Sequence, residues 1–170
     1  DTPDYQNADD LFTTQSVRGT SRVLCFSPRH DLSLAEMQTQ DIIKVVEMWS
    51  EQVTELEQTY AWIQVFESKG EIIGTSNPHP HGQIWASDFL PYQPSREDAE
   101  QLAYFKKHGR PLLVDYLERE LETRERIVTS NDHWVALVPY WGYWPFEIII
   151  VPRRHVLRIP DLSNDERNAL

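Results

Sequence analysis

The sequence predicts an α+β fold in which antiparallel strands pack against helices in two tandem units, each incomplete in this chain. Three observations carry this prediction. A helical pattern in the first half separates one strand-like segment from a pair of others. Charged helical segments in the second half precede another pair of strands, and the two halves resemble each other in part. Short strands joined by turns, with helices packed against them, are typical of antiparallel α+β architectures.

The first elements follow from local patterns. Residues 1–12 are polar and acidic and predict a flexible lead-in, after which 20–27 has the composition of a strand. Ser33 and Glu36 have the spacing of a capping box, and apolar residues then recur at helical intervals, so we expect a long amphipathic helix over 33–59. Those apolar positions are Ile42, Val45, Val46, Trp49, Val53 and Leu56.

A hairpin should follow this helix and pack beneath it. Its strands are expected at 61–67 and up to Ala86, with a turn at 69–70 between them. Cys25 is the only cysteine, which excludes a disulfide within the chain, and its place in an apolar run predicts a buried strand cysteine.

The second half begins with a Pro-rich segment at 91–95. Two charged helices are expected after it, one over 96–107 and one with Pro111 in its first turn. The alternating charges of 118–126 are those of a solvated helix face. Two strands are then predicted, 133–140 and 146–151, separated by an aromatic turn at 141–145.

An internal similarity relates the two halves. Residues 23–32 and 149–157 both show a strand, a Pro-Arg pair, a histidine and a leucine, and helix starts follow at Ser33 and Ser163. The pattern favours two copies of one α+β unit. Because each copy lacks strands that the other has, we expect the chain to be the central part of a larger protein.

Composition restricts the function classes. Of 170 residues, 40% are hydrophobic and 11% aromatic, which excludes a disordered chain. The net charge of −11 argues against nonspecific binding to nucleic acid or to an anionic membrane surface, since either needs a positive surface. No apolar run approaches the roughly 20 residues of a membrane span, and residues 1–4 have no leader-like pattern, so we expect a cytoplasmic protein.

The segment His79-Pro80-His81-Gly82-Gln83 is the strongest candidate for chemistry. On a strand, positions 79, 81 and 83 point to one face, which would place two imidazoles and a carboxamide together. A histidine acts as a nucleophile when one ring nitrogen is held as N–H by an acceptor and the other presents its lone pair. A structural metal half-site or a hydrogen-bonded surface patch would use the same three residues.

With its flanks, this segment resembles the histidine-triad superfamily, in the branch where glutamine replaces the third histidine. Within that branch it is similar to the galactose-1-phosphate uridylyltransferase family, and the similarity extends over nearly the whole chain. The stretches that carry it are 18–28, 62–67, 74–85, 113–116, 138–141 and 144–147. The resemblance implies a histidine-triad-like antiparallel sheet in each unit, with 1–92 the C-terminal part of a first unit and 93–170 the N-terminal part of a second.

The same resemblance implies an activity, a mechanism and an assembly. Members transfer UMP from UDP-glucose to galactose 1-phosphate through a covalent uridylyl-histidine, and the usual state is a homodimer. His81 would be the nucleophile, and Gln83 would donate to a phosphoryl oxygen without shuttling a proton. The family positions also imply phosphate contacts at Ser68, Gly74, Thr75 and Ser76. The family has asparagine at the place of Ser68 and cysteine at that of Thr75.

The resemblance further implies metals. His30 and His79 match two zinc ligands, the other two being cysteines outside this chain, and Glu97 matches a ligand of a second, iron-type or zinc site whose three histidines are also outside it. From the residues alone, His30 can equally be a loop or capping residue and Glu97 a first-turn helix residue favoured by the helix dipole. The remaining histidines are assigned structural or solvent roles: His108, His133 and His155.

Two alternatives stay open. A related nucleotide phosphorylase or adenylyltransferase would share the strand with two histidines and a glutamine. A truncated, non-catalytic folding or dimerisation module would share the fold without binding a nucleotide.

Overall fold

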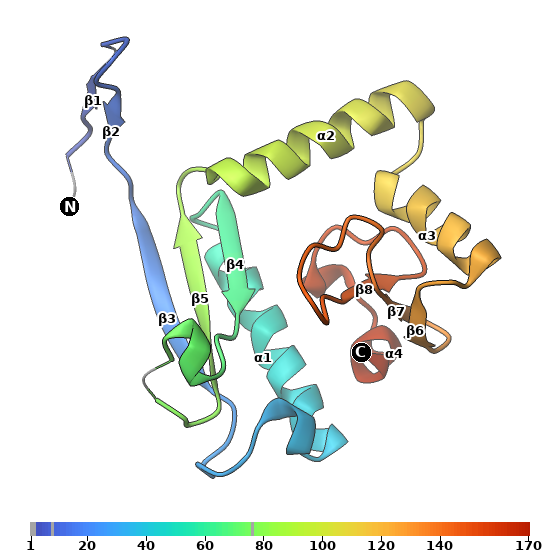
Figure 1. Cartoon of the computed structure of the whole chain (residues 1–170). Helices are drawn as coiled ribbons and strands as arrows, with labels where there is room; N and C mark the ends of the chain where they lie inside the picture. The colour runs from blue at the N-terminus through green and yellow to red at the C-terminus, as the bar shows by residue number, and fades with distance from the viewer. Residues whose placement is uncertain (1–2, 8, 76) are drawn as a thin grey trace. The chain divides into compact units, whose positions relative to one another are not determined.

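The computed structural model describes residues 3–7, 9–75 and 77–170 (Figure 1). The chain divides into two compact units, the first ending at Pro91 and the second beginning at Tyr92. Each unit has its own three-stranded antiparallel sheet and its own hydrophobic core. The α+β prediction is therefore confirmed. Among the described residues, no helix combines the length and apolarity needed to cross a bilayer.

The sheet of the first unit places the His-Gln segment in its centre. Its strands are β3 (Gly19–Cys25), β4 (Trp62–Phe66) and β5 (His81–Ser87), in the order β3-β5-β4 (Figure 1). Both neighbours run antiparallel to β5, so the backbone of β5 is paired on both sides. A central strand is the most constrained backbone in a sheet, which favours precise placement of the side chains it carries.

Helix α1 (Thr39–Leu56) packs on one face of this sheet through a core that includes Leu24, Val45 and Ile84. The helix is shorter than the predicted 33–59. Ser33 and Glu36 do form the expected hydrogen bonds, but they cap a separate 3-10 turn, η1 (Leu34–Glu36), and extended backbone follows before α1 begins. The predicted helix is thus correct in its apolar stripe and wrong at its start.

The other face of the sheet carries the side chains that alternate along each strand with the core-facing ones. Ile84 is fully buried, whereas Val23 and Trp85 are 66% and 51% exposed. Cys25 pairs with His81 in the register and is exposed. The prediction of a buried cysteine is therefore wrong, because alternation turns Cys25 away from α1 while Leu24 points toward it.

The N-terminal segment contains a short hairpin, β1 (Gln6–Asn7) and β2 (Thr14–Gln15), where a flexible lead-in was expected. Asp9 stabilises its turn, since the backbone N–H groups of Leu11 and Phe12 both donate to Asp9 Oδ1 at 2.9 Å. A carboxylate that accepts from nearby backbone donors is a common turn former.

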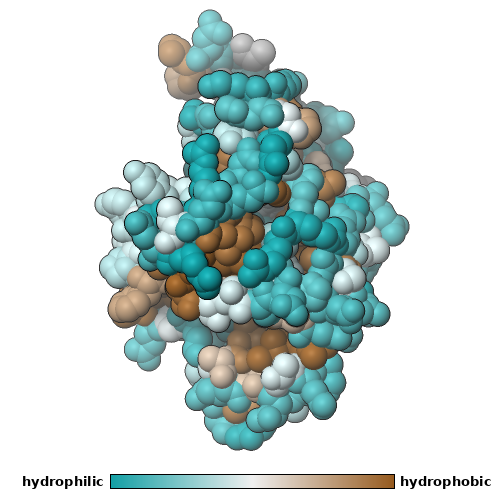
Figure 2. Space-filling view, turned by 90° about the vertical axis from the view of Figure 1, so that its right-hand side faces the viewer, coloured by the Kyte–Doolittle hydropathy of each residue, from teal (hydrophilic) through white to brown (hydrophobic). Residues whose placement is uncertain are grey.

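The second unit has two helices, a three-stranded sheet and a short final helix. The elements are α2 (Tyr92–His108), α3 (Leu112–Thr123), β6 (Ile127–Ser130), β7 (Trp134–Leu137), β8 (Ile149–Pro152) and α4 (Asn164–Ala169). Helix α2 starts within the Pro-rich segment, and Pro111 caps α3 rather than lying in its first turn. Strand β6 was not predicted because three of its four residues are exposed, leaving no alternation to detect. On the face shown in Figure 2, hydrophilic side chains predominate and hydrophobic ones form patches between them.

One charge within the segment 118–126 is not solvated. Glu120 is only 2% exposed, and Arg126 Nε lies 2.9 and 3.0 Å from its two carboxylate oxygens. Burial raises the pKa of Glu120, but hydrogen bonds from Arg126 and Tyr116 outweigh burial and hold the pKa below its ordinary value. The interpretation of 118–126 as a solvated face is therefore wrong at this position.

Glu166 is a second buried carboxylate. Arg154 Nε lies 2.5 Å from its Oε1 and Arg154 Nη2 lies 2.7 Å from its Oε2, and the N–H of Ser163 donates to Oε2 at 2.7 Å. The side-chain hydrogen bonds from Arg154, followed by the backbone bond from Ser163, lower the pKa of Glu166 from 4.5 to about 2. Its main-chain oxygen also accepts from Trp134 Nε1 at 2.8 Å, which joins α4 to β7.

This pKa gives a testable pH dependence. Because the folded pKa lies below the unfolded value, the stabilisation from Glu166 is fully present above about pH 4.5 and is lost as the pH falls toward 2. We expect Glu166→Gln to be less stable than the parent at neutral pH, with the difference shrinking as the pH falls through this window. Urea midpoints measured against pH test this expectation. Asp165→Asn, at an exposed neighbour, is the control. A stability difference between Glu166→Gln and the parent that stays constant with pH would contradict the expectation.

Candidate active site

His81 is the first residue of β5 and is half-buried. Its Nδ1 lies 2.7 Å from the backbone oxygen of His79. A carbonyl oxygen only accepts, so Nδ1 carries the hydrogen and donates it, and in the neutral imidazole Nε2 then has a free lone pair. This is the tautomer that a nucleophilic histidine requires.

Gln83 lies two residues further along β5, on the same face as His81. It is half-buried and pairs in the register with Val23 on one side and Phe66 on the other. The ring of Phe66 packs edge-on against Trp85 at a centroid distance of 4.9 Å. The carboxamide thus lies between Val23 and Phe66, on the sheet face that also carries His81.

His79 does not belong to the strand. It precedes β5, between Pro78 and Pro80, so the expected alternation on one strand applies to His81 and Gln83 alone. The two prolines lack an N–H and favour an extended entry to the strand. The N–H of Phe26 donates to the carbonyl oxygen of Pro80 at 3.0 Å, which continues the β3-β5 pairing by one bond.

The side chain of His79 faces His30. The two Nδ1 atoms are 2.9 Å apart, and the rings meet at 69° with their centroids 4.6 Å apart. Two nitrogens that bind one tetrahedral zinc ion at ~2.0 Å lie ~3.3 Å apart. The pair therefore fits half of a zinc site with only a small separation of the rings. Within the described parts of the chain, no third His, Cys, Asp or Glu joins them.

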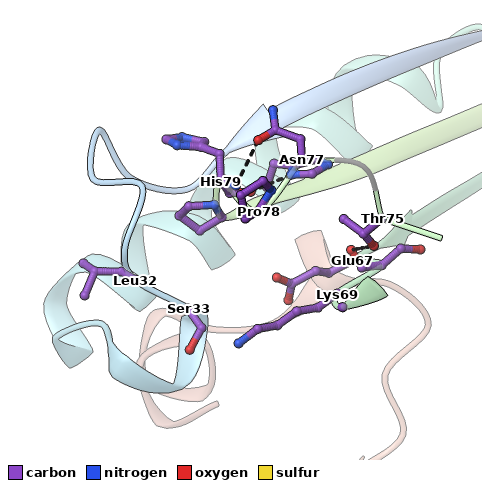
Figure 3. Close-up of a pocket in the computed structure, with 12 residues that line it drawn as sticks. Leu32, Ser33, Glu67, Lys69, Thr75, Asn77, Pro78 and His79 are labelled. Carbon is purple, nitrogen blue, oxygen red and sulfur yellow. Dashed lines mark hydrogen bonds between the residues drawn. The ribbon is translucent and has the colours of Figure 1, made fainter. Parts of the chain in front are cut away.

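A small cavity of about 30 Å³ lies beside these residues (Figure 3). His79 and His81 line it together with Ser68 and Thr75, so four of the predicted site residues meet here. Thr75 Oγ1 donates to the carbonyl oxygen of Ser68 at 2.9 Å and closes the loop between them. The cavity has room for about one water molecule.

Lys69 also lines this cavity, and the sequence had suggested only a turn there. The ammonium of Lys69 and the carboxylate of Glu67 both line the cavity, so the lining carries one charge of each sign besides its histidines. The sequence signal that could have identified Lys69 is its position next to Ser68, a predicted phosphate contact.

Two other predicted residues lie away from the cavity. Gly74 ends a 3-10 turn, η2 (Glu71–Ile73), in the left-handed region at φ 79°, so glycine there serves the backbone turn. Gln83 is on the sheet face, outside the cavity lining. Ser76, the remaining phosphate candidate, lies outside the described residues.

Glu97 is in the second unit and is exposed on α2. Because α2 begins at Tyr92, Glu97 lies in the second turn, and the first-turn interpretation is wrong. It lines a cavity of about 760 Å³ with Arg96 and Glu100. In the part of the chain that the structure describes, no group of three potential ligands includes it.

Gly82, between His81 and Gln83, has no room for a side chain. A Cβ there would lie 2.7 Å from Phe26 Cζ and 3.2 Å from the carbonyl oxygen of Phe66. We expect Gly82→Ala to lower the free energy of unfolding by about 1–3 kcal/mol, because the core must shift. Chemical denaturation measures this loss. Phe26→Leu in the Gly82→Ala background should recover part of it, and a Gly82→Ala variant as stable as the parent would contradict the account.

Comparisons with known proteins place these features in one family. The model described as "Galactose-1-phosphate uridyl transferase, N-terminal domain" matches residues 1–91, and the corresponding C-terminal domain model matches 97–170. A galactose-1-phosphate uridylyltransferase from Haemophilus influenzae is 49% identical over the whole chain, and one from Rattus norvegicus is 44% identical. The chain covers 49% and 45% of these two proteins, so it spans about half the length of the curated relatives it matches.

Solved structures agree. A structure titled "Structure of uridylyltransferase" matches 99% of the chain and 54% of its own length, with a TM-score of 0.85 and 31% identity. An ADP-glucose phosphorylase from Arabidopsis thaliana matches 89% of the chain and 48% of its own length, with a TM-score of 0.80. At 24% identity this second likeness shows the shared fold alone. The domain matches, the identities and the fold together show that the chain belongs to the galactose-1-phosphate uridylyltransferase family.

Proposed function

We propose that this chain carries the nucleotide-accepting site of a galactose-1-phosphate uridylyltransferase, which transfers UMP from UDP-glucose to galactose 1-phosphate. The observation that carries the proposal is the 2.7 Å contact between His81 Nδ1 and the His79 carbonyl oxygen. It leaves Nε2 of His81 as the nucleophile, on a strand paired on both sides.

The reaction proceeds in two displacements at one phosphorus. The Nε2 lone pair of His81 attacks the α-phosphorus of UDP-glucose. A P–N bond forms, the bond from the α-phosphorus to the bridging oxygen breaks, and glucose 1-phosphate leaves with that electron pair. A phosphate oxygen of galactose 1-phosphate then attacks the same phosphorus. The P–N bond breaks, its electrons return to Nε2, and UDP-galactose leaves.

The His79 carbonyl has a second role in this scheme. A uridylylated imidazole that keeps its Nδ1 proton is cationic, and a carbonyl oxygen at hydrogen-bond distance stabilises that charge. The proton stays on Nδ1 throughout, so both displacements proceed without a proton shuttle. This suits the amide of Gln83, which donates a hydrogen bond but cannot relay a proton to water.

We assign the phosphate contacts to three residues that line the cavity, Ser68, Lys69 and Thr75, and to Gly74 and Ser76 from the sequence pattern. Ser68, Thr75 and Ser76 supply hydroxyl donors, Gly74 lets the backbone approach the ligand, and Lys69 supplies a positive charge. All five residues lie within 68–76, so a single segment would supply these contacts.

For zinc, we propose His30 and His79 as two ligands, with the other two outside the described residues. When bound, the ion would tie together the loops that bear His30 and His79, and so fix the segment before β5. Glu97 stays a proposal as a ligand of a second zinc or an iron, because no group of three potential ligands includes it in the described chain.

We further propose the domain assignment made from the sequence: 1–92 as the C-terminal part of a first histidine-triad-like unit and 93–170 as the N-terminal part of a second. A homodimer and a cytoplasmic location stay predictions.

Isotope exchange tests the proposed function. With UDP-glucose and labelled glucose 1-phosphate alone, a covalent intermediate predicts that label enters UDP-glucose without any galactose 1-phosphate. Absence of exchange would refute the two-step mechanism. Exchange driven by ADP-glucose in preference to UDP-glucose would support the phosphorylase alternative, and absence of nucleotide binding would support the non-catalytic module.

A further inference from the structure

We propose that Asn77 is a positioning residue for His81. This inference rests on the proposed function, since it explains how the nucleophile keeps its tautomer. Asn77 Oδ1 accepts a hydrogen bond from the backbone N–H of His79 at 3.0 Å (Figure 3). The carbonyl of the same His79 accepts from Nδ1 of His81 at 2.7 Å. Asn77 therefore binds the N–H of His79, and the carbonyl of His79 orients the imidazole of His81.

The sequence leaves little else to hold this segment. Pro78 and Pro80 have no N–H, so the amide of His79 is the only backbone donor between Asn77 and His81. His79 lies outside β5 and takes no part in its ladder. The carboxamide of Asn77 thus binds the one donor of the Pro-His-Pro segment, while the N–H of Phe26 binds the carbonyl of Pro80.

These contacts fix the His79 carbonyl from both sides. Rotation of either adjoining peptide would move the oxygen away from His81 Nδ1, and the two tautomers of a neutral imidazole would then be closer in population. In the Nε2–H tautomer the lone pair needed for attack on phosphorus is lost. A small displacement of a reacting group can lower a rate by about 10²-fold.

The test compares Asn77→Ala, which removes the acceptor, with Asn77→Asp, which keeps an oxygen at the same position. Nitrogen NMR of the ¹⁵N-histidine-labelled chain reports the His81 tautomer directly. We expect Nδ1–H in the parent and in Asn77→Asp, and a mixture of tautomers in Asn77→Ala. The rate of UMP transfer to His81 should fall about 10–100-fold in Asn77→Ala, with little change in the KM for UDP-glucose, and recover in large part in Asn77→Asp.

Three results would overturn the proposal. The first is an unchanged Nδ1–H tautomer in Asn77→Ala, and the second is an unchanged transfer rate. The third is a slower rate that parallels loss of zinc and is reversed by added zinc, since that would place the effect at the metal. The NMR measurement needs no turnover, so it tests the positioning role separately from the activity. If Asn77→Ala changes the His81 tautomer but the parent chain accepts no UMP, the result would count against the proposed function and not against the positioning role.

Discussion

Replacement of His81 by asparagine is expected to abolish UMP transfer. Asparagine has similar size and can keep one hydrogen bond to the His79 carbonyl, but it has no ring nitrogen with a free lone pair. Removing the nucleophile of a covalent mechanism lowers turnover by about 10⁴-fold or more. The initial rate of UDP-galactose formation and the yield of protein-bound UMP both measure this loss.

His155→Asn is the matched control for this variant. His155 is exposed in the second unit, and the pseudo-repeat relates it to His30 rather than to the nucleophile. It should retain the UMP adduct at the parent level. Normal turnover in His81→Asn would refute the assignment of the nucleophile, and equal losses in both variants would point to a general effect on folding.

Gln83→Glu should have the second largest effect. The two side chains have nearly the same shape, but the carboxylate has no donor and carries a negative charge. It would replace a proposed hydrogen bond to a phosphoryl oxygen by repulsion. Loss of one such donor lowers the rate by about 10²–10³-fold, and we expect that loss in the first half-reaction, measured as the rate of His81 uridylylation.

Gln64→Glu separates this effect from a simple change in charge. Gln64 is exposed and pairs with Trp85 in the register, so it lies on the same sheet face as Gln83. The control adds the same charge to the same face at a distance from His81, and its rate should change by less than about 10-fold. Similar losses in the two variants would contradict a specific role for the Gln83 amide.

Much of the first unit could be predicted because its signals are local. The capping pair Ser33–Glu36, the helical stripe and the alternation of His81 and Gln83 each depend on residues close in sequence. The exposure of Cys25 could not be read this way. The run Val23–Phe26 is apolar at every position, so composition does not say which side chains face α1, and the register with β5 decides it.

The hydrogen bonds that orient His81 could not be predicted from the sequence either. The bond from His81 to the His79 carbonyl depends on the backbone path through two prolines, and the bond from Asn77 depends on the same path. The buried Glu120 was missed for a related reason. A charge pattern along a helix does not show that Arg126, beyond its end, returns to cover one carboxylate.

The most direct test of the central claim is peptide mass spectrometry after incubation with UDP-glucose and quenching at alkaline pH, where a phosphoramidate of histidine survives. The account predicts a single UMP group on the peptide that contains His81, formed without galactose 1-phosphate and released when galactose 1-phosphate is added. Absence of an adduct, or an adduct on a peptide without His81, would contradict it.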